Sequence, residues 1–358
     1  MKATLSCHAD GTYWDRERDS ELVCLDVLDE THDIRTFTFR AKDNRYFSFE
    51  AGQYFAFEIP GDNAVEQRCY TIASSPLRPR TISITVKRVT GGLVSNWLHD
   101  NMRPGMTLVA QGPAGAFTLP AGGTGKYLFL SGGVGITPLM SISRALADAA
   151  IRSDIVFLHA ARTPEDLVFH QELALLAGRS PEFRLFMLPE NRGGNSGFSG
   201  VTGRISQELL ALAVPDIHER VVMCCGPAPF MENARTICSA LGVPAHHYLE
   251  ESFNAAVLME SEIDTPVSLD VTTFNITYSR QGRTIQALPE QSVLAAAMKN
   301  SIRIPSSCAN GVCGTCKSKL VSGSVDMKHG GGIRQREVDA GMFLPCCSRP
   351  LSDLVIER

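Results

Sequence analysis

Three cysteines near the end of the chain lie in one short loop with the spacing C-x4-C-x2-C: Cys308, Cys313 and Cys316. Two adjacent cysteines, Cys346 and Cys347, follow further along the chain. Thiolates in this arrangement can close around two irons, with three ligands from the loop and a fourth from a returning strand. The cysteines therefore predict a [2Fe–2S] cluster, with either Cys346 or Cys347 as the fourth ligand.

The residues between the loop cysteines also suit a cluster. Gly311 and Gly314 allow tight turns that aim backbone N–H groups at sulfur. A zinc site and a disulfide pair are the alternatives, but structural zinc favours two C-x2-C pairs or mixtures of Cys and His. The sequence holds no second C-x2-C pair, so the iron–sulfur interpretation is favoured.

A second group of chemically useful residues, Arg68, Tyr70 and Thr71, lies on a predicted strand. An arginine can bind a pyrophosphate through two hydrogen bonds, and the tyrosine shares its face of the strand and can stack on a planar ring. The threonine offers a hydroxyl to a ring nitrogen. A surface arginine beside a packed tyrosine would leave the same pattern. However, residues 91–98 predict a glycine-headed helix whose N-terminus can receive phosphate, which favours a flavin diphosphate site.

A glycine turn follows the apolar run at residues 127–130 and leads into a predicted helix. It contains Gly133, Gly135 and Pro138, and it suits a dinucleotide pyrophosphate because the backbone can approach closely and proline fits the first helical turn. It departs from the G-x-G-x-x-G fingerprint, since Pro138 holds the third glycine position. A purely structural turn is the alternative.

Two more stretches lie at the ends of predicted strands, in the same part of the chain as the glycine turn. Cys224 and Cys225 close the last long apolar strand, where ligands of open α/β sheets gather. One of these thiols can approach a nicotinamide, or both are small buried hydrophobic residues. Residues 250–253, Glu-Glu-Ser-Phe, end the domain and offer an acid and an aromatic ring beside the flavin.

Three domains would position these groups. Residues 20–120 contain short runs in which apolar and polar side chains alternate, and glycine and proline separate these runs. This pattern predicts an antiparallel barrel. Residues 121–254 alternate apolar strands with helices, which predicts a parallel sheet covered on both faces. The predicted strands are 22–27, 35–39, 54–59, 67–72, 81–89 and 107–110, then 127–130, 155–158, 183–188 and 220–223; the predicted helices are 138–150, 166–177 and 206–212.

The ends of the chain are assigned as follows. Residues 1–19 are expected to form an N-terminal tail, from which Tyr13 and Trp14 pack back on the body. Residues 255–266 are expected to be a linker. Residues 267–358 form the cluster domain, with strands at 267–271 and 274–278 and a helix at 292–300.

The bulk composition narrows the possible partners and compartment. A net charge of −4 and a pI near 6.2 give no basic footprint for nucleic acid. The eleven cysteines are an odd number and unevenly clustered, residues 1–20 are polar, and no apolar run is long enough to span a bilayer. We expect a cytoplasmic protein with reduced thiols that binds neither nucleic acid nor a membrane.

The order of these motifs resembles the ferredoxin–NAD(P)H reductase superfamily with a fused plant-type [2Fe–2S] ferredoxin domain. The resemblance covers residues 20–358 and rests on the Arg-x-Tyr-Thr strand, the Gly-Gly-Val-Gly-Ile-Thr-Pro turn and the cysteine loop. It implies a multidomain fold: an antiparallel β-barrel flavin domain, an α/β parallel-sheet nucleotide domain and an α+β β-grasp ferredoxin domain.

The resemblance also implies site residues. FAD is expected to contact Arg68, Cys69, Tyr70, Thr71, Val86, Lys87, Gly92, Leu93, Val94 and Ser95. NADH is expected to contact Gly133, Val134, Gly135, Thr137, Arg162, Cys225, Gly226 and Pro227, with Phe253 at the cofactors. The residues expected to act in catalysis are Tyr70, Thr71, Cys225 and Glu251; the doubled acid, Glu250-Glu251, leaves a one-residue ambiguity.

The same resemblance selects the fourth cluster ligand. In such ferredoxin domains the last ligand stands four residues before a proline, as Cys346 stands before Pro350. The expected ligands are therefore Cys308, Cys313, Cys316 and Cys346, and not Cys347.

The implied function is an electron-transfer reductase that passes electrons from NADH through FAD to the cluster and then to a partner protein. Reductases with a C-terminal ferredoxin domain resemble the partners of Rieske-type oxygenases, including those that demethylate quaternary amines such as glycine betaine. An NADH reductase of a hybrid cluster protein and a cluster-based redox sensor are the alternatives. FMN could replace FAD, and NADPH stays open because Arg162, Glu190 and Arg192 give opposing signals on a 2′-phosphate.

Overall fold

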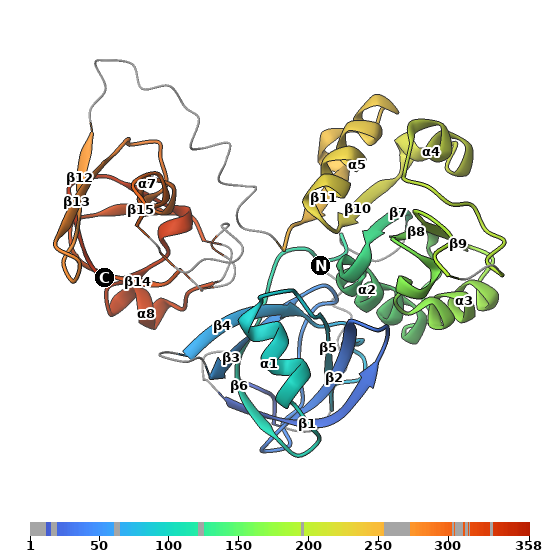
Figure 1. Cartoon of the computed structure of the whole chain (residues 1–358), viewed down its shortest axis with the longest axis horizontal. Coiled ribbons are helices and arrows are strands. Elements are labelled where there is room, and N and C mark those ends of the chain that lie inside the picture. The colour runs from blue at the N-terminus through green and yellow to red at the C-terminus, as the bar shows by residue number, and fades with distance from the viewer. Residues whose placement is uncertain are drawn as a thin grey trace. The chain divides into compact units, whose positions relative to one another are not determined.

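The computed structural model describes residues 12–15, 20–60, 65–120, 125–194, 197–253, 273–302, 304, 311, 314, 316–329 and 332–358. The chain divides into two compact units (Figure 1). The first comprises Met1–Glu66 and Tyr70–Ser252, and the second comprises Gln67–Cys69 and Phe253–Arg358.

The N-terminal half of the first unit, together with residues 67–69 of strand β4, is a six-stranded barrel with the strand order β4-β3-β6-β1-β2-β5. Its strands are β1 (Ser20–Asp29), β2 (Ile34–Ala41), β3 (Tyr54–Pro60), β4 (Val65–Thr71), β5 (Ile82–Lys87) and β6 (Thr107–Ala114). An antiparallel bridge between Ile72 and Ile84 brings the edge strands β4 and β5 together. One helix, α1 (Leu93–Asn101), lies between β5 and β6.

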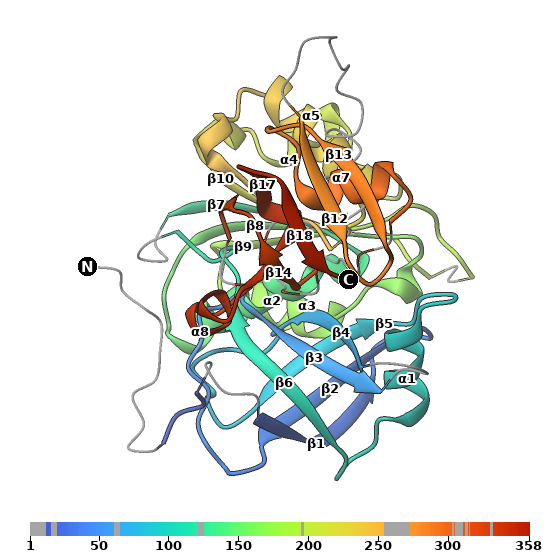
Figure 2. The ribbon, with the colours of Figure 1, turned by 90° about the vertical axis from the view of Figure 1, so that its left-hand side faces the viewer.

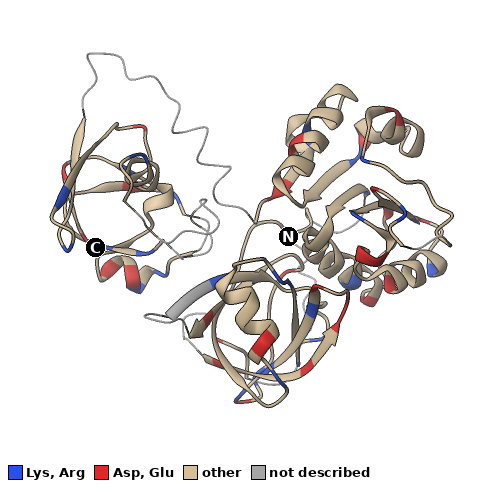
Figure 3. Cartoon of the chain, in the orientation of Figure 1, with Lys and Arg blue, Asp and Glu red and all other residues tan. Residues whose placement is uncertain are grey.

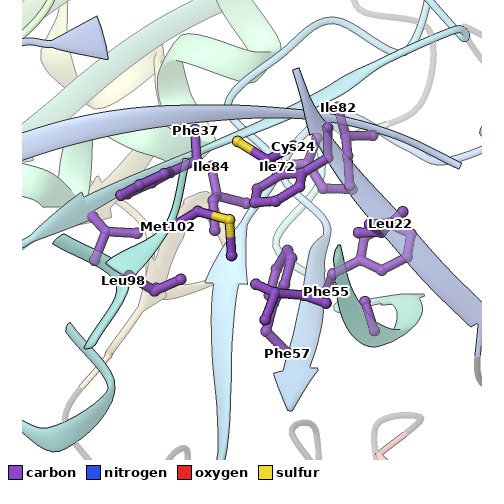
Figure 4. Close-up of a cluster of buried hydrophobic side chains, with 14 of the residues drawn as sticks. Leu22, Cys24, Phe37, Phe55, Phe57, Ile72, Ile82, Ile84, Leu98 and Met102 are labelled. Atoms are coloured by element: carbon purple, nitrogen blue, oxygen red, sulfur yellow. The ribbon is translucent and has the colours of Figure 1, made fainter. Parts of the chain in front are cut away.

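Aromatic and aliphatic side chains fill the barrel. Figure 4 shows Phe37, Phe55 and Phe57 from β2 and β3 meeting Leu98 of α1 in this core. Each fully buried side chain of this kind contributes about 1.5–3 kcal/mol relative to an exposed one. Trp14 joins the same core, and its indole N–H donates a hydrogen bond of 2.9 Å to the carbonyl oxygen of Gly112.

A five-stranded parallel sheet forms the rest of the first unit, in the order β11-β10-β7-β8-β9 (Figure 1). The strands are β7 (Lys126–Gly132), β8 (Asp154–Ala161), β9 (Phe183–Pro189), β10 (Val221–Cys225) and β11 (Tyr248–Glu251). The helices are α2 (Ile136–Asp148), α3 (His170–Arg179), α4 (Gln207–Ala213) and α5 (Ala228–Ala240). All adjacent strands run parallel, as the apolar strand–helix alternation predicts.

Alternate residues of these strands pack into two different cores. The core on the α2 and α3 side contains Phe129 and Phe157, and it includes barrel residues such as Ala73 and Phe117. The core on the α4 and α5 side contains Leu158 and other residues of opposite parity. Both faces of the sheet are therefore covered by apolar contacts.

In the parallel-sheet part of the chain, the prediction from sequence placed one helix wrongly and did not include another. Instead of a continuous helix over 166–177, a short 3-10 turn, η2 (Pro164–Asp166), precedes α3. Thr163 caps that turn, and Phe169 has a left-handed φ of 57°, which prevents continuous helix geometry. Helix α5 was not predicted, although Pro229 in its first turn is a common signal of a helix N-terminus.

The second unit has a mixed five-stranded sheet with the order β13-β12-β18-β14-β16. Its elements are β12 (Phe274–Tyr278), β13 (Arg283–Ala287), α7 (Val293–Lys299), β14 (Ser318–Ser322), β15 (Val325–Met327), α8 (Gln335–Asp339), β16 (Met342–Phe343), β17 (Ser348–Pro350) and β18 (Leu354–Glu357). In Figure 2, β18 lies between β12 and β14. The apolar face of α7 packs in the core, which gives the predicted α+β fold.

The predicted fold class is confirmed in all three parts. The predicted domain limits stay a prediction, and the linker at 255–266 and the strand at 267–271 fall outside the described residues. Acidic and basic residues are both scattered over the described elements of each unit (Figure 3). Within the described part of the chain, no helix has the length and apolar character needed to cross a membrane.

Candidate functional site

Strand β4 carries the residues predicted to hold the flavin ring. Tyr70 is partly buried against the barrel core, with its ring centroid 6.0 Å from that of Phe57. The Thr71 side chain is buried, whereas Arg68 and Cys69 are half-buried. The ring of Tyr70 therefore packs against the ring of Phe57 in the barrel core.

Strand β5 continues this surface beyond the Ile72–Ile84 bridge. Val86 is buried in the barrel core, and its carbonyl oxygen lies 2.9 Å from Nε2 of His99. The ammonium group of Lys87 lies 3.0 Å from a carboxylate oxygen of Asp33. Of the two predicted flavin contacts on β5, Val86 can therefore offer only its backbone.

The start of α1 is built for an anion through its backbone. Gly92 is the N-cap residue, and no side chain caps the helix. The hydroxyl of Ser95 instead accepts a hydrogen bond of 3.2 Å from the backbone N–H of Val89, while Val94 points into the barrel core. The first N–H groups of a helix have no intrahelical partner, so the backbone of 93–95 can donate to a phosphate.

The turn between β7 and α2 has the close backbone contacts that its glycines predict. A Cβ on Gly135 would lie 2.4 Å from the carbonyl oxygen of Cys225, so no side chain fits there. Gly133 has a φ of +53°, and the space around its Cα is open. The hydroxyl of Thr137 donates to the carbonyl oxygen of Val134 at 3.2 Å. The turn thus presents backbone to a ligand at Gly133 and packs on β10 at Gly135.

The end of β10 closes on this turn from the other side. A Cβ on Gly226 would approach the backbone nitrogen of Gly132 to 3.0 Å. Pro227 then starts α5. The structure therefore brings the predicted nucleotide residues at 133–137 and 225–227 together at one edge of the sheet.

Cys225 and Glu251 stand side by side on paired strands. Their Cα atoms are partners in the β10–β11 ladder, and both side chains lie on the α2 face. Burial raises the pKa of Glu251 to about 8, and its Oε2 has no hydrogen-bond partner among the described residues. Burial also raises the pKa of Cys225. Both groups are therefore uncharged at neutral pH, and Glu251 is the acid of the doubled pair that points to this face. Glu250 pairs with Arg235 instead.

Helix α2 ties the nucleotide turn to the flavin strand. Ser141 Oγ donates to the carbonyl oxygen of Ser74 at 2.8 Å, and the guanidinium of Arg144 donates to that of Ala73 at 2.7 Å. Residues 73 and 74 follow Thr71 of the flavin group after one intervening residue, Ile72. Because α2 begins at the glycine turn, one rigid helix connects the two groups of predicted residues.

Residues predicted to read the nucleotide ribose lie beyond β8 and β9. Arg162 is exposed, and its carbonyl oxygen accepts a hydrogen bond of 3.1 Å from the N–H of Asn191. Glu190 forms an ion pair with Arg204, at 3.2 Å. The structure brings the loops after β8 and β9 together, and they carry both a basic side chain, Arg162, and an acidic one, Glu190.

Two of the predicted cluster ligands are described in the second unit. Cys316 and Cys346 are both buried, with their sulfur atoms 3.3 Å apart. The backbone N–H of Gly311 donates to Cys346 Sγ at 3.2 Å, and Gly311 has a φ of +67°. Neighbouring thiols with an N–H···S bond fit the donor set of an iron–sulfur cluster. Cys308 and Cys313 lie outside the described residues.

Cys347 has a different environment from Cys346. Its Sγ lies near the carbonyl oxygen of Leu344, at 3.6 Å, and a Cβ on Gly311 would meet it at 2.5 Å. The Cys347 thiol therefore occupies the space that a side chain at position 311 would need.

Family models match the three parts of the chain separately. An oxidoreductase FAD-binding domain matches residues 24–119, an oxidoreductase NAD-binding domain residues 129–236, and a 2Fe–2S iron–sulfur cluster binding domain residues 276–351. The glycine betaine monooxygenase reductase subunit of Chromohalobacter salexigens is 42% identical over 93% of this chain and 94% of its own. The chain belongs to the oxygenase reductase family.

Two further comparisons agree with this assignment. The reductase is 35% identical to the stachydrine N-demethylase reductase subunit of Rhizobium meliloti, over 94% of this chain and 96% of that protein. Its fold matches phthalate dioxygenase reductase with a TM-score of 0.58 and 24% identity, over 96% of this chain and 98% of that one. The reductase is an NADH-dependent oxidoreductase that uses FAD and a [2Fe–2S] cluster, as predicted.

The sequence interpretation overlooked two buried residues of this reductase. Ser131 and His159 lie in register with Cys225 and complete a polar row across the strand ends. A histidine within the otherwise apolar run of β8 was a signal that could have revealed them.

Proposed function

We propose that this chain passes electrons from NADH to a Rieske-type oxygenase component that acts on a quaternary amine such as glycine betaine. The observation that carries the proposal is the meeting of the glycine turn, Cys225 and Glu251 at one sheet edge that α2 links to the Tyr70–Thr71 segment. The identity of 42% to a glycine betaine monooxygenase reductase subunit supports the nature of the acceptor.

In this proposal the barrel residues orient the flavin. Arg68 and the backbone at the start of α1 neutralise its phosphates, while Tyr70 and Thr71 contact its ring. The backbone of β5 at Val86 and the cation of Lys87 complete the site. A flavin held by these residues would supply hydride acceptance from NADH and single-electron transfer to the cluster.

The sheet edge would hold the nicotinamide nucleotide. Gly133 leaves room for its pyrophosphate, and Arg162 lies on the side of the ribose. Cys225 is fully buried, and Glu251 is partly exposed but its carboxyl Oε2 is buried. Because burial raises the pKa of both groups, they would provide an uncharged surface. Phe253 is exposed and stays a predicted contact of the cofactors.

The proposed compartment is the cytoplasm. Among the described residues, Cys24, Cys224, Cys225, Cys238, Cys346 and Cys347 are free thiols, and a reducing compartment keeps thiols available as cluster ligands. The proposed acceptor docks weakly, because electron-transfer interfaces are usually small and transient.

Anaerobic mixing with NADH tests the reductase activity. The flavin and cluster absorbance should bleach rapidly, and a purified Rieske-type oxygenase for a quaternary amine should then restore it. Slow bleaching would indicate a redox sensor instead of a turnover enzyme. Rapid bleaching with re-oxidation only by a hybrid cluster protein would reject the oxygenase as acceptor. Extraction of the flavin beside FAD and FMN standards checks the cofactor independently.

A pair of cysteine variants tests the cluster ligands. Cys346→Ser should abolish or alter the visible spectrum of the cluster, because it removes the sulfur that lies 3.3 Å from Cys316. Cys347→Ser is the matched control at the neighbouring position and should leave the spectrum unchanged. The opposite result would assign ligation to Cys347.

A further inference from the structure

A row of polar side chains crosses the carboxyl ends of the parallel strands. In the ladders, Cys225 pairs with Glu251 on one side and with Ser131 on the other, and Ser131 pairs in turn with His159. Residues at matching register in a parallel sheet point to the same face. The row therefore lies on the face covered by α2, at the edge that would receive the nucleotide.

Ser131 and His159 form the buried end of this row. Both side chains are fully buried, and Ser131 Oγ lies 2.8 Å from His159 Nδ1. The same hydroxyl can donate to the carbonyl oxygen of Leu158 at 3.4 Å. The imidazole thus uses Nδ1 to hold the serine.

The other imidazole nitrogen is unsatisfied. His159 Nε2 is buried and has no hydrogen-bond partner among the described residues. A buried polar atom without a partner normally destabilises a fold, so histidine is a poor choice at this position for stability alone. Burial lowers the pKa of His159 to about 3, which keeps the ring neutral.

Ser131 directly precedes the turn that would receive the nucleotide. Gly132 follows it and packs against Pro227, Gly133 has the open space above its Cα, and Gly135 touches the backbone of Cys225. A hydrogen bond that fixes Ser131 therefore fixes the point at which the chain leaves β7 and enters the turn.

We propose that His159 is a positioning residue for NADH binding, which acts by holding Ser131 and, through it, the turn at residues 132–135. This inference rests on the proposed nucleotide site. Replacing His159 should weaken binding of the nucleotide without removing any group that touches the reacting atoms.

Two substitutions of the same residue separate the two ring nitrogens. In His159→Asn the side-chain amide takes the place of Nδ1 and can keep the bond to Ser131, whereas in His159→Gln it takes the place of Nε2 and loses that bond. We expect His159→Gln and Ser131→Ala each to raise KM for NADH, and the Kd for NAD+ in equilibrium dialysis, about tenfold. In the His159→Asn variant both constants should stay within about twofold of those of the parent chain. The kcat and the flavin content should change little in all three variants.

The effects of Ser131→Ala and His159→Gln on the Kd for NAD+ should also be non-additive. If His159 acts only through Ser131, the double variant Ser131→Ala/His159→Gln should be no worse than either single variant. Leu158→Ala is the matched control, because this buried side chain points to the opposite face of β8. It should lower thermal stability but leave the Kd for NAD+ unchanged.

Several outcomes would overturn the inference. An unchanged Kd in Ser131→Ala and His159→Gln, an equally raised Kd in Leu158→Ala, or strictly additive effects would each show that His159 has only a packing role. If His159→Gln does not fold, Ser131→Ala alone decides, since it removes only one oxygen atom. A parent chain that binds no NAD+ would instead refute the proposed function.

Discussion

The two ends of the parallel sheet treat buried polar groups in opposite ways. At the amino ends, the fully buried Arg220 donates to carboxylate oxygens of Asp154 and Asp216 and to the carbonyl oxygen of Tyr127. At the carboxyl ends, His159 and Glu251 each keep a buried polar atom without a partner among the described residues.

The difference separates stability from binding. The hydrogen bonds from Arg220 hold the pKa of Asp216 well below its ordinary value, so the charges at the amino ends stabilise the fold. At the carboxyl ends, burial raises the pKa of Glu251 and lowers that of His159. Both groups therefore stay neutral, and their burial lowers the stability of the fold. Such unsatisfied groups persist where a ligand or a mechanism requires them.

The largest effect is expected at the amino end. Arg220→Ala would leave two carboxylates without their shared partner and should lower local stability by about 3 kcal/mol, the low end for a broken buried pair because both acids are partly solvated. Hydrogen exchange of peptides from β7 and β10 measures this loss. The KM for NADH of the folded protein should not change; a large rise would show that the two ends are not separate.

An intermediate effect is expected from Glu251→Gln. Glu251 has a raised folded pKa of about 8, so the folded state keeps its proton while the unfolded state loses it above an ordinary pKa near 4.5. Stability should therefore fall as pH rises between about 4.5 and 8, by about 2 kcal/mol from pH 4.5 to pH 6. The Gln variant lacks this slope, and hydrogen exchange at both pH values compares the two proteins. Equal slopes would mean that Glu251 is ionised in the fold.

The smallest effect is expected from Arg184→Ala, the matched control for Arg220. Arg184 reaches the same Asp154 at 3.3 Å, but its side chain is 41% exposed. An exposed ion pair contributes at most about 1 kcal/mol. The same exchange experiment should show little change, and a loss as large as that of Arg220→Ala would mean that burial does not set the strength of these pairs.

Periodicity in the sequence was enough to predict the fold class of the first two domains, whereas the β-grasp class of the third came from the family resemblance. The alternation in the first domain and the continuous apolar strands in the second each depend on neighbouring residues alone. The error at 166–177 arose because Phe169 adopts a left-handed φ, which its residue type disfavours and only its packed surroundings explain.

The sequence by itself determined the cysteine spacing and the glycine turn, because these follow from the chemistry of single residues at fixed intervals. The residues expected to contact the cofactors came from the family resemblance and stay predictions. Only the tertiary structure decided that Glu251 lies beside Cys225, that Cys346 faces Cys316, and that Ser131 and His159 complete the row. Strand order and burial make these pairs, and neither is visible in a local pattern.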